Sequence, residues 1–182
     1  MIPWILSAKA YKPRSTRADR HGRPRRAADN AMIGAFRNEG APMALGDIMT
    51  AAVVTVEMDD RLGVVKEIFD TMNFHHLLVV DQHKKLSGVV SDRDLLRALS
   101  PYVGSAAETA RDLATLNKRV HQIMSRHPIA LHPQSGIAEA VSLLLAHRIS
   151  CIPIVDDDFR PVGIVSWRDV LKALVPGAKG PG

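Results

Sequence analysis

The 182-residue sequence has few aromatic residues, which make up 4% of it, and a single cysteine, Cys151. So few aromatic side chains argue against a base-stacking platform for single-stranded nucleic acid. One cysteine excludes an internal disulfide framework and a zinc site built from cysteines, and it favours a reducing, cytoplasmic setting. The apolar runs are only a handful of residues long, so no membrane span is predicted. A hydrophobic content of 46% nevertheless indicates a folded chain of one or two small domains.

The positive charge of the chain is confined to its N-terminal end. The formal net charge is +5, but residues 1–42 carry nine basic and three acidic side chains, whereas the remainder carries 15 and 16. Because the segment is rich in Arg, Ala, Pro and Gly and lacks apolar periodicity, we expect residues 1–42 to form a disordered basic tail. The tail is either simply solvated or an arm that binds a polyanion such as nucleic acid. A transit peptide and a true start at Met43 are further alternatives.

An internal repeat dominates the rest of the chain. Residues Gly46–Pro101 (copy 1) align with His121–Pro176 (copy 2) without a gap at an offset of 75, and thirteen of the 56 positions are identical. Roughly three or four identities are expected by chance at average residue usage. The chain is therefore a duplicated unit, and we divide it into a tail (1–42), a first domain (43–101), a linker (102–119), a second domain (120–176) and a short C-terminal tail (177–182).

The hydrophobic pattern of each copy predicts the element order β-α-β-β-α, so the predicted fold class is α/β (α+β). In copy 1 the predicted strands and helices are 53–56, 62–72, 77–80, 86–90 and 93–99. In copy 2 they are 129–131, 137–147, 152–155, 162–165 and 168–174. Ser105 and Glu108 have the spacing of a capping box that would open a helix in the linker. One copy holds too little core to be stable alone, so we expect the two to pack together as a pseudo-two-fold pair.

The strongest functional candidate is the junction between the last strand and last helix of each copy. The sequence Gly88-Val-Val-Ser91-Asp-Arg93-Asp94 recurs as Gly163-Ile-Val-Ser166-Trp-Arg168-Asp169. A Ser at a helix start can cap the helix or bind a phosphate or ribose, the Asp three residues later can accept hydrogen bonds from two vicinal hydroxyls, and the Arg can reach a phosphate. The competing interpretation is a variant capping box that needs no ligand, and duplicated caps would look the same.

The repeat resembles a tandem pair of cystathionine-β-synthase (CBS) domains, often called a Bateman module. The resemblance covers about residues 45–176 and rests on Ile48-Met49-Thr50, Ile123-Met124-Ser125, Pro153-Ile154-Val155-Asp156 and the two Gly-to-Asp junctions. It implies a non-enzymatic regulatory module that binds adenosine-containing ligands (AMP, ADP, ATP or S-adenosylmethionine) in clefts between the two units and signals to a partner. It also implies a homodimer, for which helices 62–72 and 137–147 could supply the contact. The alternative assigns these helices to the intramolecular core.

The resemblance further implies which residues form the clefts, because in the family the Ser and Asp of one copy face the first residues of a strand in the other. One cleft would join Ser166, Arg168 and Asp169 to Thr50, Val54, Phe74, His75, His76 and Leu78. The other would join Ser91, Arg93 and Asp94 to Ser125, Ile129, Ile149, Ser150, Cys151 and Pro153.

Several departures from the family pattern predict that the two clefts are not equivalent. Leu78 stands where copy 2 has Pro153, His75 and His76 add bulk and possible charge, and Trp167 stands where copy 1 has Asp92. Neither the spacing of the eight histidines nor the lone thiol supports a metal site, and no resident cofactor is expected. No nucleophile–base pair or phosphate loop is visible, which leaves nucleic-acid association through the tail as the alternative function and an enzyme as a weaker third hypothesis.

Overall fold

The structure, a computed structural model, describes residues 43–72 and 74–174. The predictions for the basic tail (1–42) and for the C-terminal tail (177–182) lie outside these residues. No helix among the described residues is long and apolar enough to cross a membrane.

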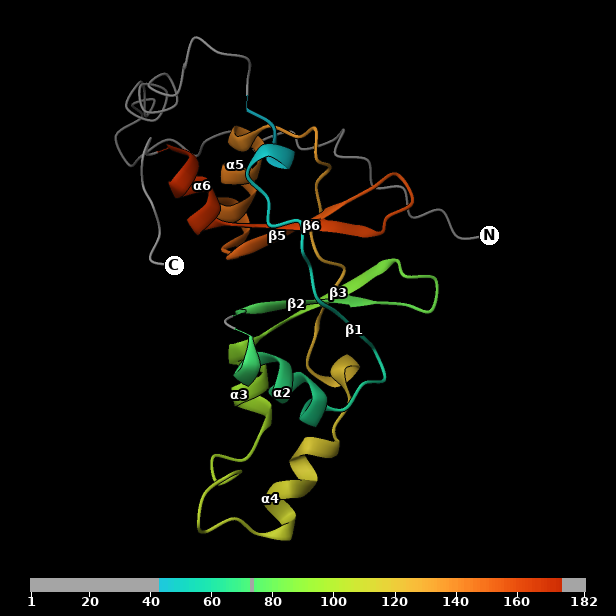
Figure 1. The fold of residues 1–182 in the computed structure, drawn as a ribbon, viewed down its shortest axis with the longest axis vertical. Coiled ribbons are helices and arrows are strands. Elements are labelled where there is room, and N and C mark those ends of the chain that lie inside the picture. The colour runs from blue at the N-terminus through green and yellow to red at the C-terminus, as the bar shows by residue number, and fades with distance from the viewer. Residues whose placement is uncertain (1–42, 73, 175–182) are drawn as a thin grey trace, which may run out of the picture. The chain divides into compact units, whose positions relative to one another are not determined.

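Copy 1 has the predicted element order, after a short 3₁₀ helix η1 (Leu45–Asp47). Its elements are β1 (Thr55–Glu57), α2 (Leu62–Thr71), β2 (His76–Val80), β3 (Leu86–Ser91) and α3 (Asp92–Ala98). The strand β1 lies parallel to β2, which forms an antiparallel hairpin with β3. The mixed α/β class is thereby confirmed, with the first strand starting two residues later than predicted (Figure 1).

Copy 2 repeats this arrangement with fewer paired strands. Its elements are a 3₁₀ helix η3 (Val120–Gln122), β4 (Ser125–Arg126), α5 (Ile137–His147), β5 (Cys151–Val155), β6 (Pro161–Ser166) and α6 (Trp167–Leu174). The strand β4 pairs not with copy 2 but with β3, so the four-stranded sheet has the order β1-β2-β3-β4 and the second sheet contains only β5 and β6.

The strand predicted at 129–131 is wrong, because pairing there is reduced to one parallel bridge between Leu131 and Ile154. Leu131 donates its N–H to Pro153 O at 3.1 Å and accepts from Val155 N at 2.9 Å. Extension of this ladder requires N–H donors on either side, and Pro133 and Pro153 have none. The equivalent positions of copy 1 are Met58 and Leu78, which keep their N–H groups, and there β1 pairs over three residues.

The helix predicted to open at Ser105 is also placed wrongly. The linker helix α4 (Ala110–Ala114) is capped instead by Thr109, whose hydroxyl accepts from Asp112 N while the Asp112 carboxylate accepts from Thr109 N. Glu108 turns back to accept from Gly104 N at 2.6 Å, so Ser105 and Glu108 stabilise a turn before the helix. A short 3₁₀ helix η2 (Thr115–Asn117) completes the linker.

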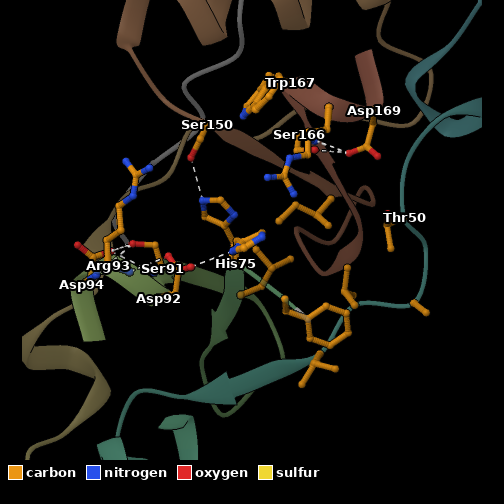
Figure 2. Close-up of a pocket in the computed structure, with 18 of the residues that line it drawn as sticks. Thr50, His75, Ser91, Asp92, Arg93, Asp94, Ser150, Ser166, Trp167 and Asp169 are labelled. Atoms are coloured by element: carbon orange, nitrogen blue, oxygen red, sulfur yellow. Dashed lines mark hydrogen bonds and ion pairs between the residues drawn. The ribbon is translucent and has the colours of Figure 1, made fainter. Parts of the chain in front are cut away.

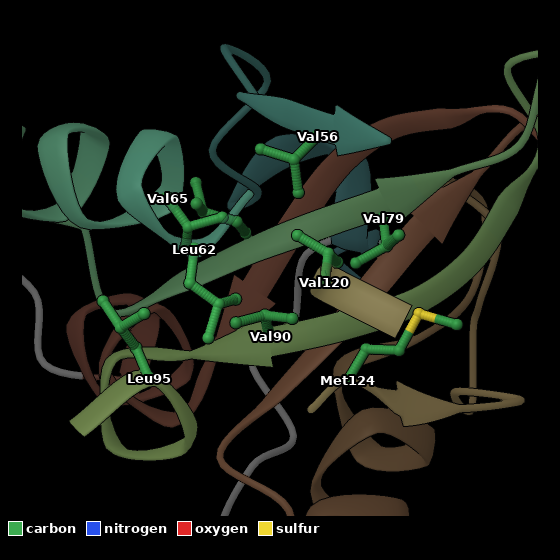
Figure 3. Close-up of a cluster of buried hydrophobic side chains, with 9 residues drawn as sticks. Val56, Leu62, Val65, Val79, Val90, Leu95, Val120 and Met124 are labelled. Carbon is green, nitrogen blue, oxygen red and sulfur yellow. The ribbon is translucent and has the colours of Figure 1, made fainter. Parts of the chain in front are cut away.

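The two copies exchange their leading segments, 44–50 and 119–125. Leu45 is fully buried in the core of copy 2, next to Ala140 and Leu144 of α5. Its counterpart Val120 is fully buried in the core of copy 1, beside Leu62 and the strands β2 and β3 (Figure 3). Figure 1 shows η1 lying against α5 accordingly.

Backbone hydrogen bonds repeat this exchange in both directions. Gly46 N donates to Pro133 O at 2.8 Å, and its counterpart His121 N donates to Met58 O at 2.9 Å. The bridge between Thr50 and Ile164 is likewise the counterpart of the pairing between Ser125 and Val89. These matched contacts confirm the pseudo-two-fold packing of the two copies.

Two glycine–methionine contacts explain residues that the repeat holds constant. A Cβ added to Gly88 would lie 2.8 Å from Met124 Sδ, and one added to Gly163 would overlap Met49 Sδ. Each glycine thus admits the methionine of the exchanged segment against its strand. Between the sheets, the buried side chains of Leu78, Leu86 and Val155 pack against each other.

Candidate functional site

The two repeated junctions form helix caps at the starts of α3 and α6. Ser91 donates its N–H and its hydroxyl to Asp94 Oδ2, at 3.0 and 2.6 Å, and its Oγ accepts from Asp94 N at 3.2 Å. Ser166 donates in the same way to Asp169 Oδ2, at 2.7 and 2.6 Å. Both Ser–Asp pairs therefore form capping hydrogen bonds, and whether they also bind a ligand is a separate question.

Capping occupies only one oxygen of each carboxylate. Oδ1 of Asp94 and Oδ1 of Asp169 take part in none of the hydrogen bonds within the described part of the chain. Figure 2 shows one oxygen of Asp169 on Ser166 and the other turned away from it. Both aspartates also line a cavity, so the cap and a free acceptor coexist in the same side chain.

The larger cavity has a volume of about 610 Å³ and is built from both copies. Figure 2 shows Ser91 and Asp94 at one side, Ser166 and Asp169 at the other, and His75 between them. Of the residues predicted for ligand contact, it is lined by Thr50, Val54, Phe74, His75, His76, Leu78, Ser91, Arg93, Asp94, Ser150, Ser166, Arg168 and Asp169.

The smaller cavity has a volume of about 200 Å³ and also draws on both copies. The predicted residues that line it are His76, Ser91, Asp94, Ser125, Ile129, Ile149, Ser150, Cys151 and Pro153. Four residues, His76, Ser91, Asp94 and Ser150, line both cavities, whereas Asp169 lines only the larger one. The two cavities are therefore unequal in size and share one wall.

Two histidines contribute to the electrostatics of the larger cavity, and one of them, His76, also lies in the shared wall. His76 Nε2 lies 2.8 Å from Ser150 Oγ, a hydrogen bond between the first residue of β2 and the loop before β5. Burial lowers the pKa of His76, and the positive charges of His75 and Arg93 act in the same direction against the attraction of Asp92 and Asp94.

His75 pairs with Asp92 instead, with 2.8 Å between Nδ1 and Oδ2. Partial burial opposes ionisation of Asp92, but the hydrogen bonds from His75 and from the Arg93 N–H outweigh it, so the pKa of Asp92 lies below its usual value. This pair has no counterpart in copy 2, where Ser150 and Trp167 occupy the equivalent positions.

Several lining residues were not predicted as contacts. In the larger cavity they include Arg97 and Lys172, each four residues after a predicted arginine, and Trp167, whose ring lies 5.6 Å from the Arg168 guanidinium carbon. Helical spacing alone could have identified Arg97 and Lys172, because residues at i and i+4 share a helix face. In the smaller cavity Arg148 was missed; it ends α5 in a left-handed conformation with φ of 53°.

Cys151 lines the smaller cavity but is buried, and burial raises the pKa of its thiol to about 12. It is therefore a small apolar wall residue and not a reactive thiol at neutral pH. Among residues 43–72 and 74–174, no group of three or more His, Cys, Asp or Glu side chains is placed to hold a metal ion.

Comparison with known proteins identifies the repeated unit. A family model of the CBS domain matches residues 45–101 and again residues 120–176. A CBS domain-containing protein of Dictyostelium discoideum is 30% identical over 129 residues, which cover 70% of this chain and 88% of that protein. The inosine-5′-monophosphate dehydrogenase of Methanocaldococcus jannaschii is 29% identical over 126 residues, but the match covers only 22% of that enzyme.

Solved structures agree with this match. The CBS domain of a membrane protein from Sphaerobacter thermophilus is 29% identical with a TM-score of 0.67, covering 82% of this chain and 99% of that one. A CBS domain pair in complex with 5′-methylthioadenosine and S-adenosyl-L-methionine is 26% identical with a TM-score of 0.60, covering 72% and 99%. CBSX2 of Arabidopsis thaliana, solved in complex with AMP, is 26% identical with a TM-score of 0.59, covering 72% and 95%.

Proposed function

The chain belongs to the CBS domain family and carries two copies of the domain, and from this premise we propose that it is a regulatory module that binds adenosine-containing ligands between its two copies. The observation that carries the proposal is the divided role of Asp94 and Asp169. One oxygen of each fixes the helix start, and the other is an uncommitted acceptor on a cavity wall. Such an oxygen suits the vicinal hydroxyls of a ribose.

The walls around these carboxylates support a nucleoside as the ligand. The larger cavity offers an apolar surface from Val53, Val54, Phe74 and Ile164 on which a flat base fits, together with a few polar groups. Two related proteins of the same fold are solved with adenosine compounds, AMP in one case and S-adenosyl-L-methionine with 5′-methylthioadenosine in the other.

We propose binding without turnover, in the cytoplasm. The chain matches 88% of a protein described only as containing CBS domains, but about a fifth of the dehydrogenase, so the match to that enzyme does not extend to the remainder of its chain. A ligand held by both copies favours the arrangement that it fits best, and it shifts the population only by its differential affinity. A partner protein that distinguishes the two arrangements would receive the signal.

Thermal unfolding of the full chain with AMP, ATP and S-adenosylmethionine tests the proposal. A ligand present at 100 times its Kd adds about 2.7 kcal/mol to the free energy of unfolding. Trp167 lines only the larger cavity, so quenching of its fluorescence in a Trp4→Phe background reports occupancy of that cavity. If none of the three compounds raises the unfolding temperature or changes the fluorescence, the proposal fails.

Asp94→Asn and Asp169→Asn separate ligand binding from capping. An Asn can keep its amide oxygen on the Ser N–H, and it then presents an NH₂ group to the cavity where the hydroxyls need an acceptor. We expect ligand binding to be lost with little change in the free energy of unfolding. Asp157→Asn is the matched control, because it removes the same charge from an exposed turn outside both cavities.

We also propose that the module assembles as a homodimer through α2 and α5. Both helices bury one face in the core, through Leu62 and Leu144 among others, but they leave Val64 47% and Leu145 74% exposed, and Met72, directly after α2, is 46% exposed. Exposed apolar side chains of this size mark contact surfaces when they are grouped. Sedimentation of the wild type and of Leu145→Glu tests the assignment; a wild-type monomer, or a dimer unaffected by Leu145→Glu, contradicts it.

A further inference from the structure

Four cationic side chains from both copies line the larger cavity. Arg93 and Arg97 lie one helical turn apart on α3, and their repeat equivalents Arg168 and Lys172 lie one turn apart on α6. None of the four forms an ion pair with an acidic side chain of the described chain. A cavity lined by cations from two separate helices attracts anions, and it suits a multiply charged anion best.

Each acidic group of the same cavity already makes at least one hydrogen bond within the fold. Asp92 is paired with His75, and Asp94 and Asp169 each hold a helix cap through one oxygen. Their charges reduce the positive potential but do not neutralise the outer pair, Arg97 and Lys172, which lie a further turn along each helix. The cavity therefore combines hydroxyl acceptors at the helix starts with cations farther along.

We propose that these four side chains bind a polyphosphate chain. The preferred ligand of the larger cavity is then an adenosine nucleotide whose phosphates carry three or more charges. A sulfonium compound such as S-adenosylmethionine is not preferred. This inference rests on the proposed function for the adenosine part of the ligand, whereas the polyphosphate part stands on the four cations alone. Arginine binds phosphate oxygens through two parallel hydrogen bonds, and lysine binds them as a point charge. A positively charged sulfonium gains nothing from either.

The arrangement also gives the phosphate chain a structural role. The arginine of one helix is sufficient to bind a single phosphate, but a longer phosphate chain can contact α3 of copy 1 and α6 of copy 2 at once. Affinity is then expected to rise with phosphate number, and the longer ligand links the two copies more firmly than AMP does. This chain-length dependence is the property that the experiment addresses.

The test is titration calorimetry of the full chain with adenosine, AMP, ATP and inorganic triphosphate, without divalent cations. We expect ATP to bind at least about tenfold more tightly than AMP, and inorganic triphosphate to bind in the absence of any base. The double variant Arg97→Gln/Lys172→Gln should weaken ATP and triphosphate about tenfold and leave adenosine unchanged. Lys85→Gln, an exposed cation outside both cavities, should change none of these affinities.

Each result bears on one of the two proposals. If ATP binds no more tightly than AMP, the polyphosphate site is overturned. It is also overturned if the double variant binds triphosphate as well as the wild type does, because triphosphate would then bind to another basic part of the chain. If triphosphate binds and depends on Arg97 and Lys172 while adenosine and AMP do not bind, the polyphosphate site stands and the adenosine function fails.

Discussion

Copy 1 and copy 2 share one chain path but differ in how their outer strands are held. In copy 1 the central hairpin is flanked by β1 and β4, whereas in copy 2 the same positions carry only single bridges at Leu131 and Thr50. The Ser–Asp cap is nevertheless present in both, with hydroxyl-to-carboxylate distances of 2.6 Å. The geometry of the candidate site thus depends on the hairpin and the following helix, and it tolerates the loss of the outer ladder.

The copies differ more in the chemistry that they bring to the cavities. Copy 1 contributes the His75–Asp92 pair and the partly buried imidazole of His76, while copy 2 contributes Ser150 and the half-exposed ring of Trp167 at positions equivalent to His75 and Asp92. The two cavities therefore differ in lining residues as well as in volume. Variants placed at equivalent positions of the two copies test how far the equivalence extends.

The largest effect is expected from the exchanged core residues. Leu45→Ala should cost about 2–5 kcal/mol, the range for a fully buried leucine, and Val120→Ala less because fewer carbons are removed. Although Leu45 precedes copy 1, hydrogen exchange should quicken first in β5 and β6 of copy 2. Faster exchange in β2 and β3 would contradict the exchange of segments.

Adding a methyl group at the two glycines should be the next most damaging change. Gly88→Ala and Gly163→Ala should each cost about 1–3 kcal/mol through overpacking. The cost should be greater at Gly88, because the new Cβ also meets the Ser125 carbonyl oxygen at 3.0 Å, whereas at Gly163 all three nearest atoms belong to the Met49 side chain.

Double-mutant cycles measured by urea unfolding check this difference. Met49→Ala should relieve most of the cost of Gly163→Ala, and Met124→Ala only part of the cost of Gly88→Ala. If the two methionine substitutions relieved the cost equally, the backbone at Ser125 would have to move away from the new methyl group at position 88.

Removal of a cap should have a smaller effect of similar size in both copies. Asp94→Ala and Asp169→Ala each lose two hydrogen bonds to a Ser and should cost about 1 kcal/mol without ligand. Asp94→Asn should cost less than Asp94→Ala, because the amide oxygen can still accept from Ser91. Equal losses for Asn and Ala, measured by thermal unfolding, would mean that the negative charge and not the hydrogen bonds stabilises the helix start.

The smallest effect is a dependence on mildly acidic pH that arises from His76 of copy 1. The pKa of His76 is lowered in the folded state from its usual 6.5, so below about pH 6.5 the unfolded chain binds more protons. Stability should therefore fall as the pH drops below 6.5, and His76→Gln, which can keep a hydrogen bond to Ser150, should flatten this slope. His83→Gln, in an exposed turn, is the control; an unchanged slope in His76→Gln refutes the assignment.

The sequence predicted the parts of this molecule that are local. The offset of 75 residues predicted which residues of the two copies are equivalent, and the Ser-x-x-Asp spacing predicted both helix caps. At Ser105 the same kind of rule failed because Thr109 and Asp112 offered a competing box four residues later. The strand at 129–131 failed because Pro133 and Pro153, both visible in the sequence, remove the donors on which a ladder depends.

What could not be predicted depends on contacts between distant residues. Nothing local to Leu45 says that its side chain belongs to copy 2, because the hydrophobic pattern is the same whichever core it enters. The hydrogen bond between His76 and Ser150 joins residues 74 positions apart and needs the packed pair to exist. The wall shared by the two cavities follows from that packing and has no signature in either copy alone.

The exchange of leading segments has a consequence for how the molecule can move. Because the chain passes from one half to the other and back, neither half can separate from its neighbour without losing part of its core, such as Val120 or Leu45. Under the proposed function, a ligand would act on two interlocked bodies, and the exchanged segments oppose the dissociation of these bodies. The same connectivity results when the two polypeptides of a domain-swapped dimer of single-copy chains are joined end to end.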